Sequence, residues 1–143
     1  MLSSLSLIAV RYAETDQMGV VHHSHYPVYF EQGRTDFFSQ HLVAYQEFEL
    51  AGLFAPVLSY SVELKGRLTY GDTLHLEVFP TAFRGLRVSM GYRGTCRDQL
   101  VVTGESSHAL TGPGLQPLHP RRLPALYSKL KETFGSALRD QTA

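Results

Sequence analysis

The stretch YPVYFEQGRTDFF, residues 26–38, decides the fold class of this chain. Its aromatic and small residues recur at helical spacing, so that they fall on one side of a helix: Tyr26, Tyr29, Phe30, Gly33, Phe37 and Phe38. Pro27 suits the first turn of that helix, where its missing N–H would have no partner anyway. The stretch therefore predicts one long helix that begins at His25 or Tyr26 and carries an aromatic face.

Segments on both sides of this helix show the two-residue alternation of β-strands. One strand is expected before the helix and four after it, at residues 5–12, 57–68, 73–83, 86–96 and 100–110. Short turn signals, such as Arg84-Gly85 and Asp98-Gln99, imply antiparallel hairpins between the last three strands. Pro80 lacks an N–H and indicates a bulge or an edge position within its strand. The pattern predicts an α+β domain whose five-stranded antiparallel sheet buries one face under the long helix.

Four further segments complete the expected single domain of residues 1–143. A short helix at residues 44–50 should end at Gly52, and a proline-rich surface connector follows the last strand at residues 112–124. A short amphipathic helix is expected from Pro124 to Phe134, and the polar tail from about residue 135 is expected to be frayed.

Composition narrows the function classes. Thirteen basic and thirteen acidic residues give a formal net charge of zero. The chain therefore lacks the surplus of basic residues that would indicate binding to nucleic acid or to an anionic membrane. The apolar opening LSSLSLIAV is too short to span a bilayer. The one cysteine, Cys96, lies in an alternating strand pattern and is expected to be buried rather than nucleophilic. A reducing cytoplasm is the expected compartment.

The polar segment ETDQMGVVHHSH, residues 14–25, has three interpretations. A metal site needs ligands at converging spacings, but His22 and His23 are adjacent and are expected to face apart. A structural loop would use Asp16 in an Asx-turn, Gly19 at positive φ, and Ser24 or His25 as the helix cap. A catalytic site would place the Asp16 carboxylate beside the unpaired amides of the helix N-terminus, where an oxyanion is stabilised. In that case Asp16 acts as nucleophile or general base, and a neighbouring histidine orients water or transfers protons.

Residues 11–38 resemble the N-terminal signature of the 4-hydroxybenzoyl-CoA thioesterase family of hotdog-fold acyl-CoA thioesterases, most closely its YbgC-like branch. The matching residues are Tyr12, Thr15, Asp16, Gly19, Val20, Val21, His23, Tyr26, Glu31, Arg34 and Thr35. A looser similarity extends over residues 5–134 and includes the Tyr70-Gly71-Asp72 turn. The resemblance implies a hotdog fold, hydrolysis of acyl-CoA to a free acid and CoA, and no metal or separate cofactor. It also implies a homodimer, or a homotetramer built as a dimer of dimers, with active sites between subunits.

Site residues follow from the same resemblance. Asp16 is the expected catalytic carboxylate and His23 the assisting histidine, whose backbone N–H polarises the thioester carbonyl. Gly19, Val21 and His22 are expected to border the substrate. His22 stands where relatives commonly have tyrosine, so which imidazole takes part stays open, and a solvent-facing or interface position is the alternative for His22.

The rest of the CoA substrate is expected to contact other strands. The pantetheine arm is expected along residues 59–62, including Tyr60 and Ser61, and the phosphates near Arg84 and Arg87, with Lys65 and Arg67 as further candidates. Acyl carrier protein is a possible alternative donor. Two other functions stay open: non-hydrolytic binding of acyl-CoA, and hydration or dehydration of an enoyl thioester. The sequence leaves the acyl chain unassigned.

Overall fold

The computed structural model describes residues 2–117 and 124–142, and it has the predicted α+β architecture. The strands and helices, in chain order, are β1 (Ser4–Ala9), α1 (Tyr26–His41), α2 (Tyr45–Leu50), β2 (Val57–Leu64), β3 (Thr73–Arg84), β4 (Arg87–Cys96), β5 (Gln99–Ala109) and α3 (Pro124–Thr142). Short 3-10 turns lie at η1 (Tyr12–Glu14), η2 (His23–His25) and η3 (Pro113–Leu115). No helix in the described ranges is long and apolar enough to cross a membrane.

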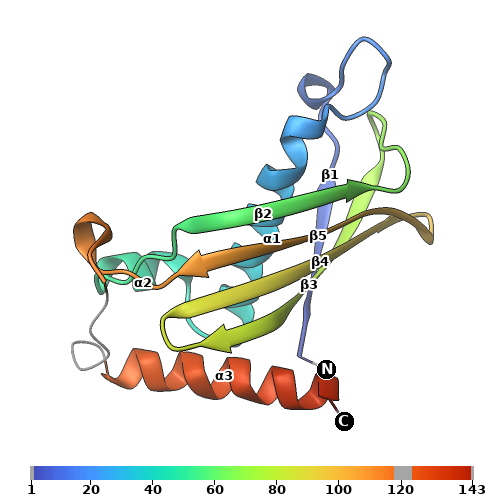
Figure 1. Cartoon of the computed structure of the whole chain (residues 1–143). Helices are drawn as coiled ribbons and strands as arrows, with labels where there is room; N and C mark the ends of the chain where they lie inside the picture. Colours follow the sequence, from blue (N-terminus) through green and yellow to red (C-terminus); the bar gives the residue numbers. More distant parts are fainter. Residues whose placement is uncertain (1, 118–123, 143) are drawn as a thin grey trace.

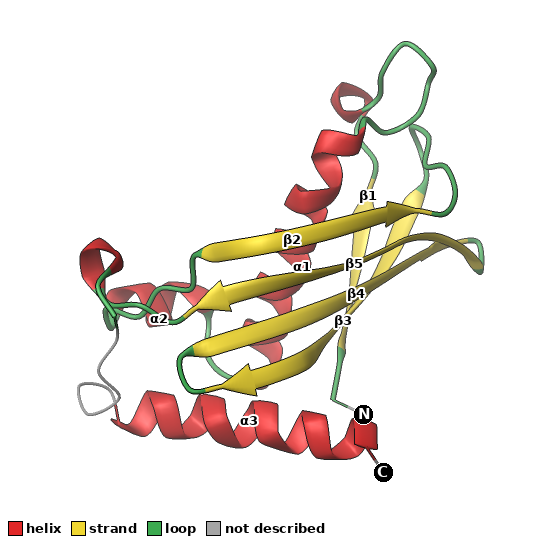
Figure 2. Ribbon diagram, in the orientation of Figure 1, coloured by secondary structure: helices red, strands yellow, loops and turns green. Residues whose placement is uncertain are grey.

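The five strands form one antiparallel sheet in the order β1-β3-β4-β5-β2. Helix α1 crosses one face of this sheet, and α3 lies along β3 at the end of the sheet away from the start of α1 (Figure 1, Figure 2). Strand β2 is at one edge and β1 at the other. This arrangement is the hotdog fold that the family resemblance implies.

The aromatic face of α1 forms the centre of the core. All six residues predicted for this face are buried. The Phe30 ring stacks on the Tyr92 ring of β4, with centroids 4.1 Å apart and planes 5° from parallel. The predicted burial of Cys96 is also confirmed.

Two glycines let α1 approach the sheet closely. A Cβ on Gly33 of α1 would lie 2.6 Å from Val78 Cγ2 of β3. A Cβ on Gly104 of β5 would lie 2.5 Å from the Ser61 carbonyl oxygen and would overlap the Phe30 ring. The helix therefore sits at a separation from the sheet that larger residues at these positions would prevent.

Local chain signals account for several boundaries. The β3–β4 register shifts between Pro80 and Ala82, so the predicted bulge is confirmed. Pairing of β3 with β1 ends at Val78, and Pro80 lies beyond it. Strand β2 ends at Leu64, earlier than the predicted residue 68, because the amides of Lys65 and Gly66 both donate to the Val101 carbonyl and break the regular ladder.

The two ends of the chain differ from the sequence prediction. Strand β1 ends at Ala9, and the chain then turns into η1 instead of continuing to residue 12. Helix α3 is longer than the predicted Pro124–Phe134 and runs to Thr142, so the tail expected to be frayed is helical. Leu130 and Phe134 of α3 are buried against the core, which anchors the helix. The connector predicted at residues 112–124 lies partly outside the described residues.

The fit at Gly104 predicts the effect of Gly104→Ala. The added methyl group must displace both the Phe30 ring and the backbone of β2, so the free energy of unfolding should fall by about 1–3 kcal/mol. Urea denaturation monitored by circular dichroism measures this change. Gly112→Ala is the control, because its Cβ would meet nothing closer than 3.8 Å and its φ is −87°. Equal stability of the two variants would show that the contact at Gly104 relaxes freely.

Candidate functional site

Asp16 lies in a hairpin-like loop, residues 14–22, that leads directly into the start of α1. Thr15 pairs with Val21, the Asp16 amide donates to the Val20 carbonyl at 2.9 Å, and the His22 amide donates to the Glu14 carbonyl at 2.9 Å. The chain before Asp16 is thus hydrogen-bonded to the chain that enters η2 and α1. The loop lies at the end of α1 opposite to α3 (Figure 1).

The Asp16 carboxylate has a fixed orientation and one free oxygen. Its Oδ1 accepts the Met18 amide at 2.9 Å, which is the Asx-turn expected for a structural loop. Within the described residues its Oδ2 accepts no hydrogen bond. Gly19 adopts φ of +80°, as predicted, and its amide donates to the Asp16 carbonyl. A half-buried carboxylate with one oxygen held and the other open can bind water or attack a carbonyl carbon.

His22 caps the helical start. Its Nδ1 accepts the Ser24 amide at 3.2 Å and lies 2.8 Å from the Ser24 hydroxyl, so neutral His22 carries its proton on Nε2. His25, one of the two predicted caps, holds the N-cap position of α1, but its side chain makes no capping hydrogen bond. The side chain that caps η2 is that of His22, which the sequence prediction did not name as a cap.

The imidazoles of His22 and His23 do not face apart, contrary to the sequence prediction. Their ring centroids are 4.1 Å apart with an interplanar angle of 32°. His23 is exposed, and its backbone N–H has no hydrogen-bond partner within the described part of the chain. Residues 2–117 and 124–142 contain no group of three His, Cys, Asp or Glu that could hold a metal ion.

A buried carboxylate, Glu14, attaches the loop to α1. Glu14 is 5% exposed, and it accepts the Tyr29 hydroxyl at 2.8 Å, the Arg11 amide at 2.8 Å and the Arg11 Nε at 3.3 Å. Burial alone would raise the pKa of Glu14, but these hydrogen bonds and the charge of Arg11 outweigh it and lower the pKa below its usual value. Burial and the bond to Glu14 raise the pKa of Tyr29, so the phenol stays protonated and donates.

A second support comes from the turn before β3. Val20 forms a β-bridge with Thr69, and the Val21 amide donates to the Leu68 carbonyl. Asp72 holds this turn by accepting the Thr69 amide, and its ion pair with Arg97, at 2.7 Å, also contributes to lowering its pKa. The Tyr70-Gly71-Asp72 signal therefore marks a structural neighbour of the loop.

The predicted substrate-binding residues are spread over the chain. Val21 is 5% exposed and belongs to the core, whereas Tyr60 and Ser61 are exposed on the edge strand β2. Arg84 and Arg87 face each other across the β3–β4 hairpin, at the opposite end of the sheet from the Asp16 loop (Figure 1). Within one chain about 35 Å of strand separates them from the loop.

Sequence reasoning missed a chain of hydrogen-bonded polar side chains that crosses the core. His108 Nδ1 lies 3.2 Å from the Ala55 carbonyl, and His108 Nε2 lies 2.7 Å from Ser106 Oγ. Ser106 Oγ lies 2.6 Å from the Tyr92 hydroxyl, which accepts Arg34 Nη1 at 3.2 Å. Burial, together with the charge of Arg34, lowers the pKa of His108 to about 4, so the ring is neutral near pH 7. The one available signal was Ser106 and His108 at two-residue spacing among the apolar positions of β5.

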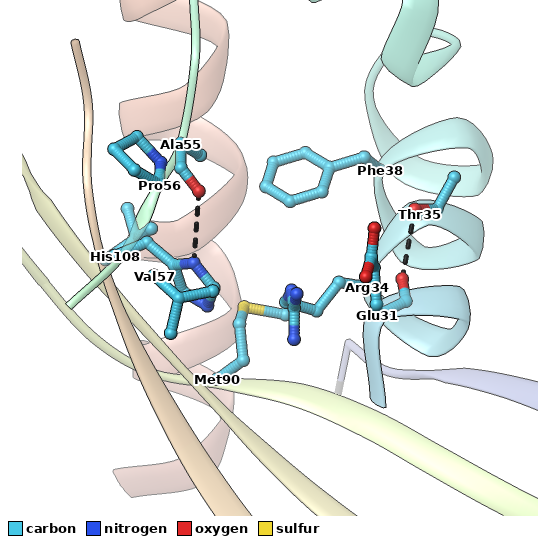
Figure 3. A pocket seen from close by; sticks show the side chains of 10 residues that line it. Glu31, Arg34, Thr35, Phe38, Ala55, Pro56, Val57, Met90 and His108 are labelled. Atoms are coloured by element: carbon cyan, nitrogen blue, oxygen red, sulfur yellow. Dashed lines mark hydrogen bonds between the residues drawn. The ribbon is translucent and has the colours of Figure 1, made fainter. Parts of the chain in front are cut away.

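Arg34 and His108 line a pocket of about 180 Å³ between α1 and the sheet. Its walls come from α1, from the segment before β2, and from β4 and β5 (Figure 3). The Arg34 side chain extends from α1 across the pocket toward Met90 (Figure 3). Asp16 and His23 are not among the residues that line it.

Glu14→Gln tests the anchoring of the loop. An amide keeps an acceptor for Tyr29 but puts N–H donors against those of Arg11, so stability at pH 7 should fall by about 1–2 kcal/mol. Because the folded pKa of Glu14 is lowered, its stabilisation is present above the unfolded value of about 4.3 and is lost as the pH falls through the folded value. The variant should therefore lose less stability than the wild type between pH 5 and pH 3. Urea denaturation at several pH values measures this, and the exposed Glu49→Gln is the control. Parallel pH dependence of Glu14→Gln and wild type would contradict the anchor.

Comparison with known proteins identifies the family. Residues 10–114 match the model of the thioesterase-like superfamily. A relative from Bacillus subtilis (strain 168), "Putative acyl-CoA thioesterase YneP", is 35% identical over 102 residues, which are 71% of this chain and 74% of that protein.

Solved structures give the same result. A DHNA-CoA thioesterase from Staphylococcus aureus has a TM-score of 0.90 at 26% identity, with 100% of this chain and 97% of that chain covered. The hypothetical protein TT1821 from Thermus thermophilus has a TM-score of 0.79 at 30% identity, with 88% and 96% covered. On this match, and with the five-stranded sheet and long helix described above, the chain belongs to the thioesterase-like superfamily, as a thioester hydrolase with the hotdog fold.

Proposed function

We propose that this protein is an acyl-CoA thioesterase in which Asp16 is the catalytic carboxylate. The observation that carries the proposal is the position of Asp16: its Oδ1 is fixed by the Met18 amide, its Oδ2 is open, and it is hydrogen-bonded through the backbone to the chain entering α1. The unpaired His23 amide lies at the start of that helical segment. This combination provides a base or nucleophile and an oxyanion donor on adjacent pieces of chain.

The chemistry needs no metal and no separate cofactor. The His23 amide polarises the thioester carbonyl and stabilises the oxyanion. Asp16 either removes a proton from water, whose oxygen then attacks the carbonyl carbon, or attacks that carbon itself to give an anhydride that water cleaves. The C–S bond breaks, the acyl group leaves as a carboxylic acid, and the CoA sulfur receives a proton. The neighbouring imidazoles of His22 and His23 can orient the water or carry that proton.

The relatives support CoA as the carrier of the acyl group. YneP is named for acyl-CoA, and the Staphylococcus aureus protein for a CoA thioester. For the CoA phosphates we favour Arg67 and Lys65 over Arg84 and Arg87 within one chain, because residues 65–67 lead into the Leu68–Thr69 segment that pairs with the Asp16 loop. Acyl carrier protein stays an alternative donor. The cytoplasm is the proposed compartment, in keeping with a free, buried Cys96.

We also propose that two protomers pair through the β2 edges. The register with β5 puts Tyr60 opposite Ser106, Val62 opposite Gly104 and Leu64 opposite Val102, so these β2 side chains point to the face that α1 covers elsewhere. Tyr60 and Leu64 are nevertheless 58% and 52% exposed. An exposed apolar stripe on an unpaired edge strand is a typical interface between copies. Leu5 and Leu7, exposed on β1, are the corresponding candidates for a dimer of dimers.

Asp16→Asn tests the catalytic assignment. The amide retains an acceptor for the Met18 N–H, so the fold and the mass of the oligomer should be unchanged. The kcat for thiol release from a panel of acyl-CoA substrates should fall by roughly 10³-fold or more. His23→Ala should lose about 10–100-fold. Gln17→Ala, an exposed neighbour in the same loop, is the control. Near-normal turnover by Asp16→Asn would refute the mechanism, and substrate retained without thiol release by the wild type would indicate a binding protein.

Val62→Lys tests the proposed interface. A charge on the apolar face of β2 should weaken self-association at least tenfold, because the ammonium group cannot be buried unpaired. Glu63→Lys is the control, because it places the same side chain at the next residue, on the opposite face of the strand. It should leave the mass of the oligomer unchanged. Analytical ultracentrifugation measures both. Two variants with the same mass as the wild type would argue against pairing at β2.

A further inference from the structure

The pocket beside Arg34 combines one cation with walls that are partly polar and partly apolar. Phe38 and Met90 provide apolar surface, and Arg34 enters from α1 (Figure 3). Val88 also lines the pocket. Arg34 is half-buried, and no carboxylate among the described residues forms an ion pair with it. A partly desolvated guanidinium without an anionic partner is unfavourable for folding, so the position requires another explanation.

The polar chain behind Arg34 fixes the direction of its hydrogen bonds. Neutral His108 donates Nδ1–H to Ala55 and accepts the Ser106 hydroxyl at Nε2. The Ser106 oxygen then accepts the Tyr92 hydroxyl proton, and the Tyr92 oxygen accepts Arg34 Nη1. Each polar hydrogen of His108, Ser106 and Tyr92 is therefore used in a hydrogen bond within the protein. The remaining N–H groups of Arg34 are the donors left to face the pocket.

Pocket size restricts what those donors can bind. The volume of about 180 Å³ slightly exceeds the roughly 150 Å³ of an engineered cavity that holds benzene. A short chain or a single ring fits, and a long fatty acyl chain does not. A carboxylate matches the planar fork of a guanidinium with two parallel hydrogen bonds.

The Arg34 side of the pocket, rather than its Val88 and His108 wall near the β3–β4 hairpin, is within reach of the proposed reaction. Arg34 is eight residues along α1 from Tyr26, which corresponds to about 12 Å along the helix axis. An acyl group of ring size and an arginine side chain can bridge this span together. The thioester carbonyl would then lie at the start of α1 and the far end of the acyl group at Arg34.

We propose that this pocket receives the acyl group and that Arg34 selects short acyl groups ending in a second carboxylate. This inference rests on the proposed acyl-CoA thioesterase function. Glu31 lines the same pocket from an exposed position on α1 and forms no ion pair with Arg34. Its negative charge opposes a bound carboxylate, so Arg34 and Glu31 should affect the selectivity in opposite directions.

The test compares adipoyl-CoA with hexanoyl-CoA, which differ only in the terminal carboxylate. The wild type should hydrolyse adipoyl-CoA with the higher kcat/KM. Arg34→Gln should lower the ratio of the two kcat/KM values by roughly tenfold or more, and Glu31→Gln should raise it. General damage to the fold lowers both values and leaves their ratio in place, so the ratio reports the charge of the two side chains.

Affinity separates this inference from the reaction itself. Thioether analogues of the two substrates cannot be hydrolysed, and calorimetry gives their Kd ratio for the wild type, Arg34→Gln and Glu31→Gln. One outcome is that the Kd ratio shifts in opposite directions in the two variants while the wild type hydrolyses neither CoA thioester. That result would support the carboxylate site and refute the thioesterase proposal. Hydrolysis of both substrates with ratios unmoved by either variant would overturn the carboxylate site alone. A ratio lowered by both variants would also overturn it, because removal of the opposing Glu31 charge should raise the ratio.

Discussion

The close contact between α1 and the sheet is the constraint on which the other features depend. Gly33 meets Val78 of β3 without a side chain of its own, and Gly104 receives the Phe30 ring directly. Because Phe30 also stacks on Tyr92, the helix is fixed along its length as well as across it. The η2 turn that leads into α1, where the oxyanion site is proposed, and the third turn of α1, where Arg34 enters the pocket, are therefore held relative to the same three strands.

Two buried polar groups use this fixed helix in different ways. Glu14 is ionised and receives hydrogen bonds from Arg11 and from Tyr29 of α1, so it transmits the helix position to the loop that carries Asp16. The chain from His108 to Tyr92 is neutral and leads to the Arg34 cation. Such groups cost free energy when a partner is missing, so complete hydrogen bonding favours one arrangement over alternatives. The first group orients a carboxylate, and the second orients a guanidinium.

A single chain presents its proposed site in an open form. His23 is exposed, Asp16 is half-buried, and the apolar side of β2 is uncovered although it points to the helix-bearing face. Pairing of two β2 edges would cover that stripe and bring a second chain toward the pocket that begins beside Val57. In the proposed dimer, the edge strand would therefore form the interface and also border the pocket.

The sequence by itself determined the elements, because they follow from local physics. Helical spacing at residues 26–38 identified the buried face of α1 residue by residue, and two-residue alternation with short turns gave the antiparallel sheet. The Asx-turn at Asp16 and positive φ at Gly19 are equally local. The tertiary structure alone decided what met across the fold: Glu14 with Tyr29, and the line from Arg34 through Tyr92 and Ser106 to His108. Periodicity states which side of an element is buried but not which residue of another element lies opposite, because that depends on the register and separation of packed layers.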